Sequence, residues 1–66
     1  MEAFDVRAKR LMRESELTYQ EVGERMGYHR DSARQIVYRF VHGRNPSAAA
    51  VAKFAKALGL TVEDVL

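Results

Sequence analysis

The sequence predicts an all-α fold, a single compact domain of five short helices over residues 1–66. Apolar residues recur at helical spacing, and no alternation of period two, which would mark a strand, persists beyond a few residues. Gly27, Gly43 and Gly59 separate the periodic segments, and glycine commonly ends a helix. The connections of about 2–5 residues suit a compact helical domain.

The first two helices are marked by their N-terminal residues. We expect the first from about Asp5 to Ser15, with Asp5 as its cap. The second, over about 18–26, begins at Thr18, and Glu21 three residues later completes the pattern of a capping box.

The remaining three helices follow glycine and proline breaks. The third is expected over about 29–42, and the fourth follows Pro46, is capped by Ser47 and reaches Leu58. A short fifth helix is capped by Thr61. Large apolar residues in these helices are assigned to the core: Phe4, Met12, Met26, Phe40 and Phe54.

Positive charge is concentrated in the middle of the chain. The net charge of +2 divides into −2 over residues 1–24, +4 over 25–44 and zero over 45–66. All the cations of the middle stretch are arginines, whose planar donors match phosphates and guanine edges. They are Arg25, Arg30, Arg34, Arg39 and Arg44.

The third helix is predicted to be amphipathic, with an unusual polar face. Its apolar face is formed by residues at i, i+3, i+4, i+7 and i+8, namely Ala33, Ile36, Val37, Phe40 and Val41. At 100° per residue the polar side chains fall within half a turn of one another. They are Arg30, Asp31, Arg34, Gln35, Tyr38, Arg39 and His42. Such side chains commonly contact phosphates and base edges, so this face indicates DNA binding.

Residues 17–36, LTYQEVGERMGYHRDSARQI, resemble the helix-turn-helix of the phage Cro and repressor family. The matched positions are Leu17, Thr18, Val22, Gly23, Gly27, Tyr28, Ala33 and Ile36. In the resemblance, Val22 and Gly23 are the residues that let the two helices approach closely. Matches continue through the last two helices, at Pro46, Ser47, Val51, Phe54, Ala55, Leu58, Gly59 and Leu60 and over 62–65. The resemblance implies a lambda-repressor-like helix-turn-helix domain and covers nearly the whole chain.

Two features depart from that family. The segment VYRFVH separates Ile36 from Gly43. This is about one helical turn more than the family usually has before its glycine, which predicts an extended recognition helix. Tyr19 stands where the family often has a glutamine that holds a phosphate and braces a neighbouring base reader, and Gln20 is the candidate for part of that role. The triplets EVG and RQI, beginning at Glu21 and Arg34, are also similar to the fourth conserved region of bacterial sigma factors.

Roles are assigned from position along the helices. The first turns of a recognition helix meet base edges, which nominates Arg30, Asp31, Arg34 and Gln35. The expected phosphate contacts are Thr18, Tyr19, Gln20, His29, Ser32, Tyr38, Arg39, His42 and Arg44. Alternatives stay open for three features. Asp31 also suits a helix N-terminus, Tyr38 also suits the rim of the core, and Val62, Val65 and Leu66 either close the core or form a self-association patch.

Other classes of protein are disfavoured by the composition. The chain has no cysteine for a disulfide or a thiolate metal site, and it has no phosphate loop or nucleophile motif. Two histidines lack partners for a metal site, so neither a metal nor a cofactor is expected. No apolar run reaches the ~18 residues of a membrane span, and the acidic start is unlike a signal peptide.

The sequence therefore predicts a DNA-binding transcriptional regulator, not an enzyme, in the cytoplasm of a bacterial host. Its expected partner is double-stranded DNA, with no membrane and no small-molecule substrate. Like a Cro or repressor protein it would bind an operator, as a homodimer on half-sites about 34 Å apart, and block transcription. Two alternatives use the same motif: a protein-interaction module, or an antitoxin or recombination accessory protein.

Overall fold

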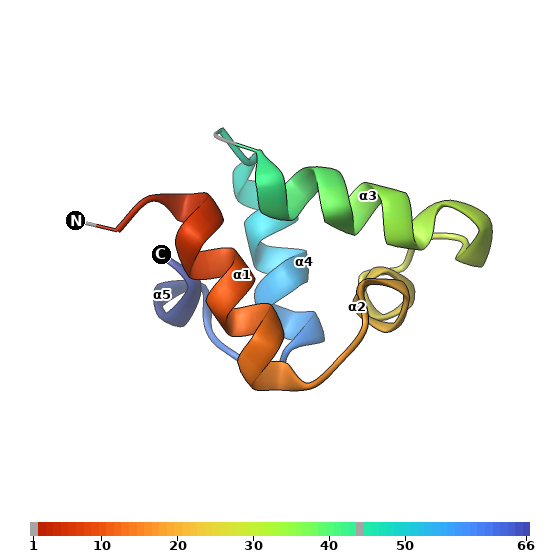
Figure 1. Ribbon diagram of the computed structural model, residues 1–66, viewed down its shortest axis with the longest axis horizontal. Coiled ribbons are helices and arrows are strands. Elements are labelled where there is room, and N and C mark those ends of the chain that lie inside the picture. The colour runs from red at the N-terminus through yellow and green to blue at the C-terminus, as the bar shows by residue number, and fades with distance from the viewer. Residues whose placement is uncertain (1, 44) are drawn as a thin grey trace.

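The computed structural model describes residues 2–43 and 45–66, and five helices span this part of the chain. They are α1 (Phe4–Ser15), α2 (Tyr19–Arg25), α3 (Arg30–His42), α4 (Ala48–Ala57) and α5 (Val62–Val65). No strand occurs among the described residues. In Figure 1, α3 lies along one side of the molecule, α4 crosses beneath it, α1 lies near the end of α3 with α5 beside α1, and α2 lies near the start of α3. The predicted all-α class is confirmed.

The N-terminal caps of α2, α4 and α5 confirm the sequence prediction. The Thr18 hydroxyl accepts a hydrogen bond from the Glu21 backbone N–H at 3.0 Å, and the Glu21 carboxylate accepts one from the Thr18 N–H at 3.0 Å. Thr61 forms the same reciprocal pair with Asp64, and Ser47 accepts from the Ala50 N–H at 3.1 Å. These bonds satisfy donors that a helix start leaves unpaired.

One predicted helix boundary is wrong in detail. The cap of α1 is Ala3, which makes no side-chain bond, and Asp5 lies inside the first turn, where the helix dipole also stabilises a carboxylate. Gly43 ends α3 in an extended conformation with a φ of −81°, and not in the left-handed conformation of a glycine cap. The left-handed residues are Glu16 at the end of α1, and Gly27 and Gly59 as predicted.

The core lies between α4 and the other helices. Phe54 of α4 is fully buried, together with Val22, Val37, Val41 and Val65. The predicted core residues Met12 and Met26 are buried, whereas Phe4 and Phe40 are half-buried and pack against the core. The rings of Phe4 and Phe40 meet edge to face at 5.3 Å, and Phe40 lies 4.9 Å from Phe54.

Helices α2 and α3 approach one another most closely at Gly23, as the family resemblance implies. A Cβ atom at this position would lie 2.5 Å from the carbonyl oxygen of Ala33 and 2.6 Å from its Cβ. Only glycine allows this contact between backbones, so Gly23 and Ala33 set the distance at which α3 is held.

Removing the cap of α2 is expected to cost about 1 kcal/mol of stability. Thr18→Ala leaves the Glu21 N–H without its side-chain acceptor, and loss of an N-cap commonly costs about this much. The measurement is urea unfolding at pH 7. Glu21 is ionised at this pH, because the hydrogen bond that its carboxylate accepts from the Thr18 N–H lowers its pKa. Thr18→Ser keeps the hydroxyl and is the matched control. An unchanged free energy of unfolding in Thr18→Ala would contradict the assignment.

Candidate nucleic-acid interface

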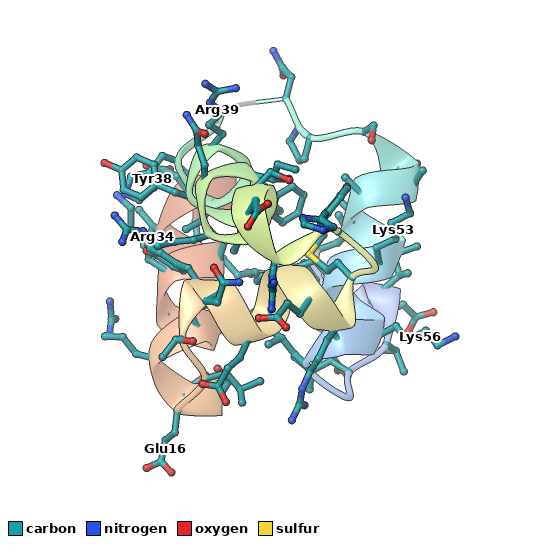
Figure 2. All side chains as sticks on the ribbon, turned by 90° about the vertical axis from the view of Figure 1, so that its right-hand side faces the viewer. Glu16, Arg34, Tyr38, Arg39, Lys53 and Lys56 are labelled. Atoms are coloured by element: carbon teal, nitrogen blue, oxygen red, sulfur yellow. The ribbon has the colours of Figure 1, made fainter. Side chains whose placement is uncertain are left out.

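The polar face of α3 is exposed along its whole length. Ala33, Val37 and Val41 are buried beneath the helix. The opposite side chains all lie in solvent: Arg30, Asp31, Arg34, Gln35, Tyr38, Arg39 and His42. Figure 2 looks toward the start of α3 and shows Arg34, Tyr38 and Arg39 fanning out from the helix on its outer side. The helix thus projects a continuous polar surface about four turns long.

Three of the four candidate base readers line one hollow. Asp31, Arg34 and Gln35 line it, with a volume of about 540 Å³, together with Gln20 and Tyr38. Arg30 is exposed at the first position of α3 and does not line this hollow. The hollow therefore brings together three of the four predicted readers and places a guanidinium beside an amide and a carboxylate.

Gln20 fixes the start of α3 to α2. Its side-chain amide donates to the backbone carbonyl of Arg30 at 2.8 Å and to the carboxylate of Glu24 at 2.8 Å. The bracing role that the sequence analysis gave to Gln20 therefore reaches the backbone of α3 and not a reader side chain. Both amide donors are used, and the first turn of α3 is held in place from outside.

The turn before α3 is closed by His29 and Ser32. The Nδ1 atom of His29 accepts from the Asp31 N–H at 3.2 Å, so the ring caps the helix. The Ser32 hydroxyl donates to the His29 carbonyl at 3.4 Å. The Asp31 carboxylate also lies 3.4 Å from the His29 ring. The side chains of His29 and Ser32 therefore both stabilise the start of α3.

Three aromatic side chains form a row that sequence reasoning missed. The Tyr38 ring stacks on the His42 ring at 4.1 Å and meets the edge of the Tyr19 ring at 6.0 Å. His42 Nδ1 donates to the Tyr38 carbonyl at 2.9 Å. Tyr38 remains 52% exposed, which places it on the surface and not in the core. The i, i+4 spacing of Tyr38 and His42 was the available signal, but the Tyr19 contact depends on how α2 and α3 cross.

The arginines of the middle stretch divide into two groups. The Arg25 guanidinium donates to the Ala57 carbonyl at 3.3 Å and so joins α2 to the end of α4. Arg30, Arg34 and Arg39 are exposed on α3, and within the described chain none lies within ion-pair distance of a carboxylate. Lys53 and Lys56 point away from Arg34 and Tyr38 (Figure 2). Among the described arginines of this middle stretch, those without an ion pair or a backbone bond therefore all lie on α3.

The other predicted phosphate contacts occupy the edges of this surface. Arg39 lines a groove of about 330 Å³ between α3 and the segment before α4, together with Asn45 and Pro46. Thr18 is exposed at the start of α2. Arg44, the remaining predicted contact, lies outside the described residues.

Over 2–43 and 45–66, no cluster of three or more histidine, aspartate or glutamate side chains is placed to hold a metal ion. None of the described helices has the length and apolar character needed to cross a bilayer.

A family model described as a helix-turn-helix domain matches residues 6–66 of the chain. The match includes α2 and α3 and nearly all of the rest of the fold. No curated protein matches the sequence. No solved structure matches it either.

Proposed function

Since this chain belongs to the helix-turn-helix domain family, we propose that it is a sequence-specific regulator of transcription that inserts α3 into the major groove of double-stranded DNA. The second helix of such a motif lies in that groove. The observation that carries the proposal is the exposed face of α3, with Gln35 and three arginines that have no ion pair among the described residues. Its likeness to phage Cro and repressor proteins favours an operator-binding repressor.

Base reading is assigned to the first two turns of α3. Arginine pairs with guanine through two donors, glutamine with adenine through a donor and an acceptor, and a carboxylate accepts from cytosine. Arg34 and Gln35 line the same hollow as Asp31, which supports assigning these side chains to neighbouring bases. Arg30 precedes them at the start of the helix. The Gln20 brace supports this arrangement because it fixes the helix end from which these side chains extend.

Phosphate contacts are assigned to the rim around those readers. Thr18, Tyr19 and Gln20 at the start of α2 form one side, and Tyr38, Arg39 and His42 continue along α3. His29 and Ser32 lie at the turn between the helices. Contacts to phosphate position a protein on the duplex and carry no sequence information directly. The extra turn of α3 thus supplies an additional contact to the DNA backbone through His42, while Phe40 and Val41 pack inward.

Arg39→Ala is expected to weaken binding to every duplex by a similar factor and to lower the salt slope by about one. The reason is that Arg39 lies at the edge of the polar face, over the groove beside Pro46 and away from the hollow of the readers. The measurement is affinity for a cognate and a scrambled duplex at several salt concentrations. A loss confined to the cognate duplex would instead make Arg39 a base reader.

Self-association is proposed through the surface at the end of α3. Phe4, Pro46, Val51, Val62 and Leu66 line an apolar groove of about 450 Å³ there, with Asn45 and Ala48. Val65 is fully buried and closes the core, whereas Val62 is 40% and Leu66 65% exposed. Val65 therefore takes the core role, and the exposure of Val62 and Leu66 supports the proposed self-association. A second copy on this surface would present its own α3 to a neighbouring half-site.

The proposal is tested by binding to a random-sequence duplex across salt concentrations. We expect measurable binding at low salt that weakens steeply as salt rises, because cations bound to phosphate are released. The control variant is Lys53→Gln with Lys56→Gln, which removes two cations that point away from Arg34 (Figure 2). No binding to any duplex at low salt would overturn the proposal and favour an acidic protein as the partner of α3.

A further inference from the structure

We propose that Lys9 and Arg13 of α1 extend the DNA-binding surface and contact the phosphate backbone beside the groove that α3 occupies. This inference rests on the proposed function and adds a helix to which neither the motif nor the sequence analysis gives a contact. It is carried by a second hollow next to that of the readers, and by the pairing of the charges on α1.

The two hollows adjoin at a pair of aromatic rings in edge contact, one ring lining each hollow. Lys9, Arg13 and Tyr19 line a groove of about 400 Å³ between α1 and the start of α2, with Met12 and Leu17 at its base. The Tyr19 ring meets the edge of the Tyr38 ring at 6.0 Å, and Tyr38 lines the hollow of the base readers. A duplex that covers α3 as far as Tyr38 therefore has only the Tyr19 ring between it and the cations of α1.

The four cations of α1 are not equivalent. Glu2 neutralises two of them, with its carboxylate 3.2 Å from Arg7 and 2.6 Å from Arg10. Arg13 is exposed and has no ion pair within residues 2–43 and 45–66. Lys9 lies 3.9 Å from Asp5, and both side chains are 40% exposed, so water weakens this pair.

Because the cations of α1 divide in this way, the net charge of the segment does not reveal its positive face. Residues 1–24 have a net charge of −2, which disfavours DNA contact by the segment as a whole. Lys9 and Arg13 are one helical turn apart and share a face, while Arg7 and Arg10 turn their charge toward Glu2. The face beside Tyr19 is thus positive although the segment is acidic. A phosphate strand is the partner that fits two cations adjoining a base-reading helix.

The test is the salt dependence of duplex binding by the double variant Lys9→Gln, Arg13→Gln. Each phosphate contact contributes about −0.9 to the slope of log affinity against log salt, so removing two should reduce the slope by about 1.8. Between 50 and 200 mM salt, the unmodified chain should lose about 12-fold more affinity than the double variant. Lys53→Gln with Lys56→Gln changes the net charge equally on another side of the molecule (Figure 2) and should leave the slope unchanged.

The outcomes separate this inference from the proposed function. Equal slopes for the two double variants would overturn the role of α1 while leaving α3 as the DNA-binding helix. Failure of the unmodified chain to bind any duplex would overturn both. Thermal unfolding of each variant, followed by circular dichroism, ensures that the folded chain is compared. Arg13→Lys, which retains the cation, should restore about half of the lost slope when Lys9→Gln is kept.

Discussion

Gly23→Ala is expected to destabilise the domain by about 2 kcal/mol or more, as a residue enlarged in a tightly packed contact commonly does. The added Cβ would meet the Ala33 carbonyl oxygen at 2.5 Å and the Ala33 Cβ at 2.6 Å. These atoms belong to the backbone and first side-chain carbon of α3, so relief requires the whole helix to move. This cost exceeds the ~1 kcal/mol that alanine gains over glycine within a helix. Because α3 carries the readers, DNA affinity should fall as well.

The measurement is the free energy of unfolding in urea, with DNA affinity determined on the same samples. Gly43→Ala adds the same methyl group where φ is −81° and the nearest atom is the Arg39 carbonyl oxygen at 3.1 Å. That control should change stability by less than about 1 kcal/mol. A Gly23→Ala variant as stable as the unmodified chain would show that α2 and α3 are held differently.

Replacing both central readers, Arg34→Ala with Gln35→Ala, is expected to cost about 2–6 kcal/mol on a cognate site, since each base contact contributes about 1–3. The affinity for scrambled DNA should fall much less, because most nonspecific affinity comes from phosphate contacts. Both side chains are exposed, and alanine favours helix, so the melting temperature should be retained.

This prediction is measured as a ratio of affinities for cognate and scrambled duplexes at one salt concentration. Lys56→Ala, on another side of the molecule (Figure 2), is the control and should preserve the ratio. An unchanged ratio in the Arg34 and Gln35 double variant would remove α3 from base recognition, even if the protein still bound DNA.

The local features of the fold followed from the sequence. Thr18, Ser47 and Thr61 cap helices through bonds that span three residues, and such short-range pairs are visible in the chain itself. Asp5 misled because a carboxylate is favourable both at a cap and in the first turn. Gly43 ends α3 as predicted, through extended backbone, because a chain can leave a helix that way as well as through the left-handed conformation.

The features that required the structure are those joining different helices. The bond from Gln20 to the Arg30 carbonyl and the contact of Tyr19 with Tyr38 depend on the crossing of α2 and α3. Whether a charged side chain has a partner depends on its neighbours in space. Arg25, counted by sequence in the positive middle stretch, donates to α4, whereas Arg13 lies unpaired beside the candidate interface, within the described chain.

Selection of bound duplexes from a random DNA pool tests the central claim most directly. We expect one sequence to be enriched, with half-sites related by twofold symmetry and centred about 34 Å apart, as a dimer presenting two α3 helices requires. The same selection with the Arg34 and Gln35 double variant should lose that sequence while still retaining DNA at low salt. A pool that shows no enriched sequence after selection with the unmodified chain would contradict sequence-specific recognition by α3.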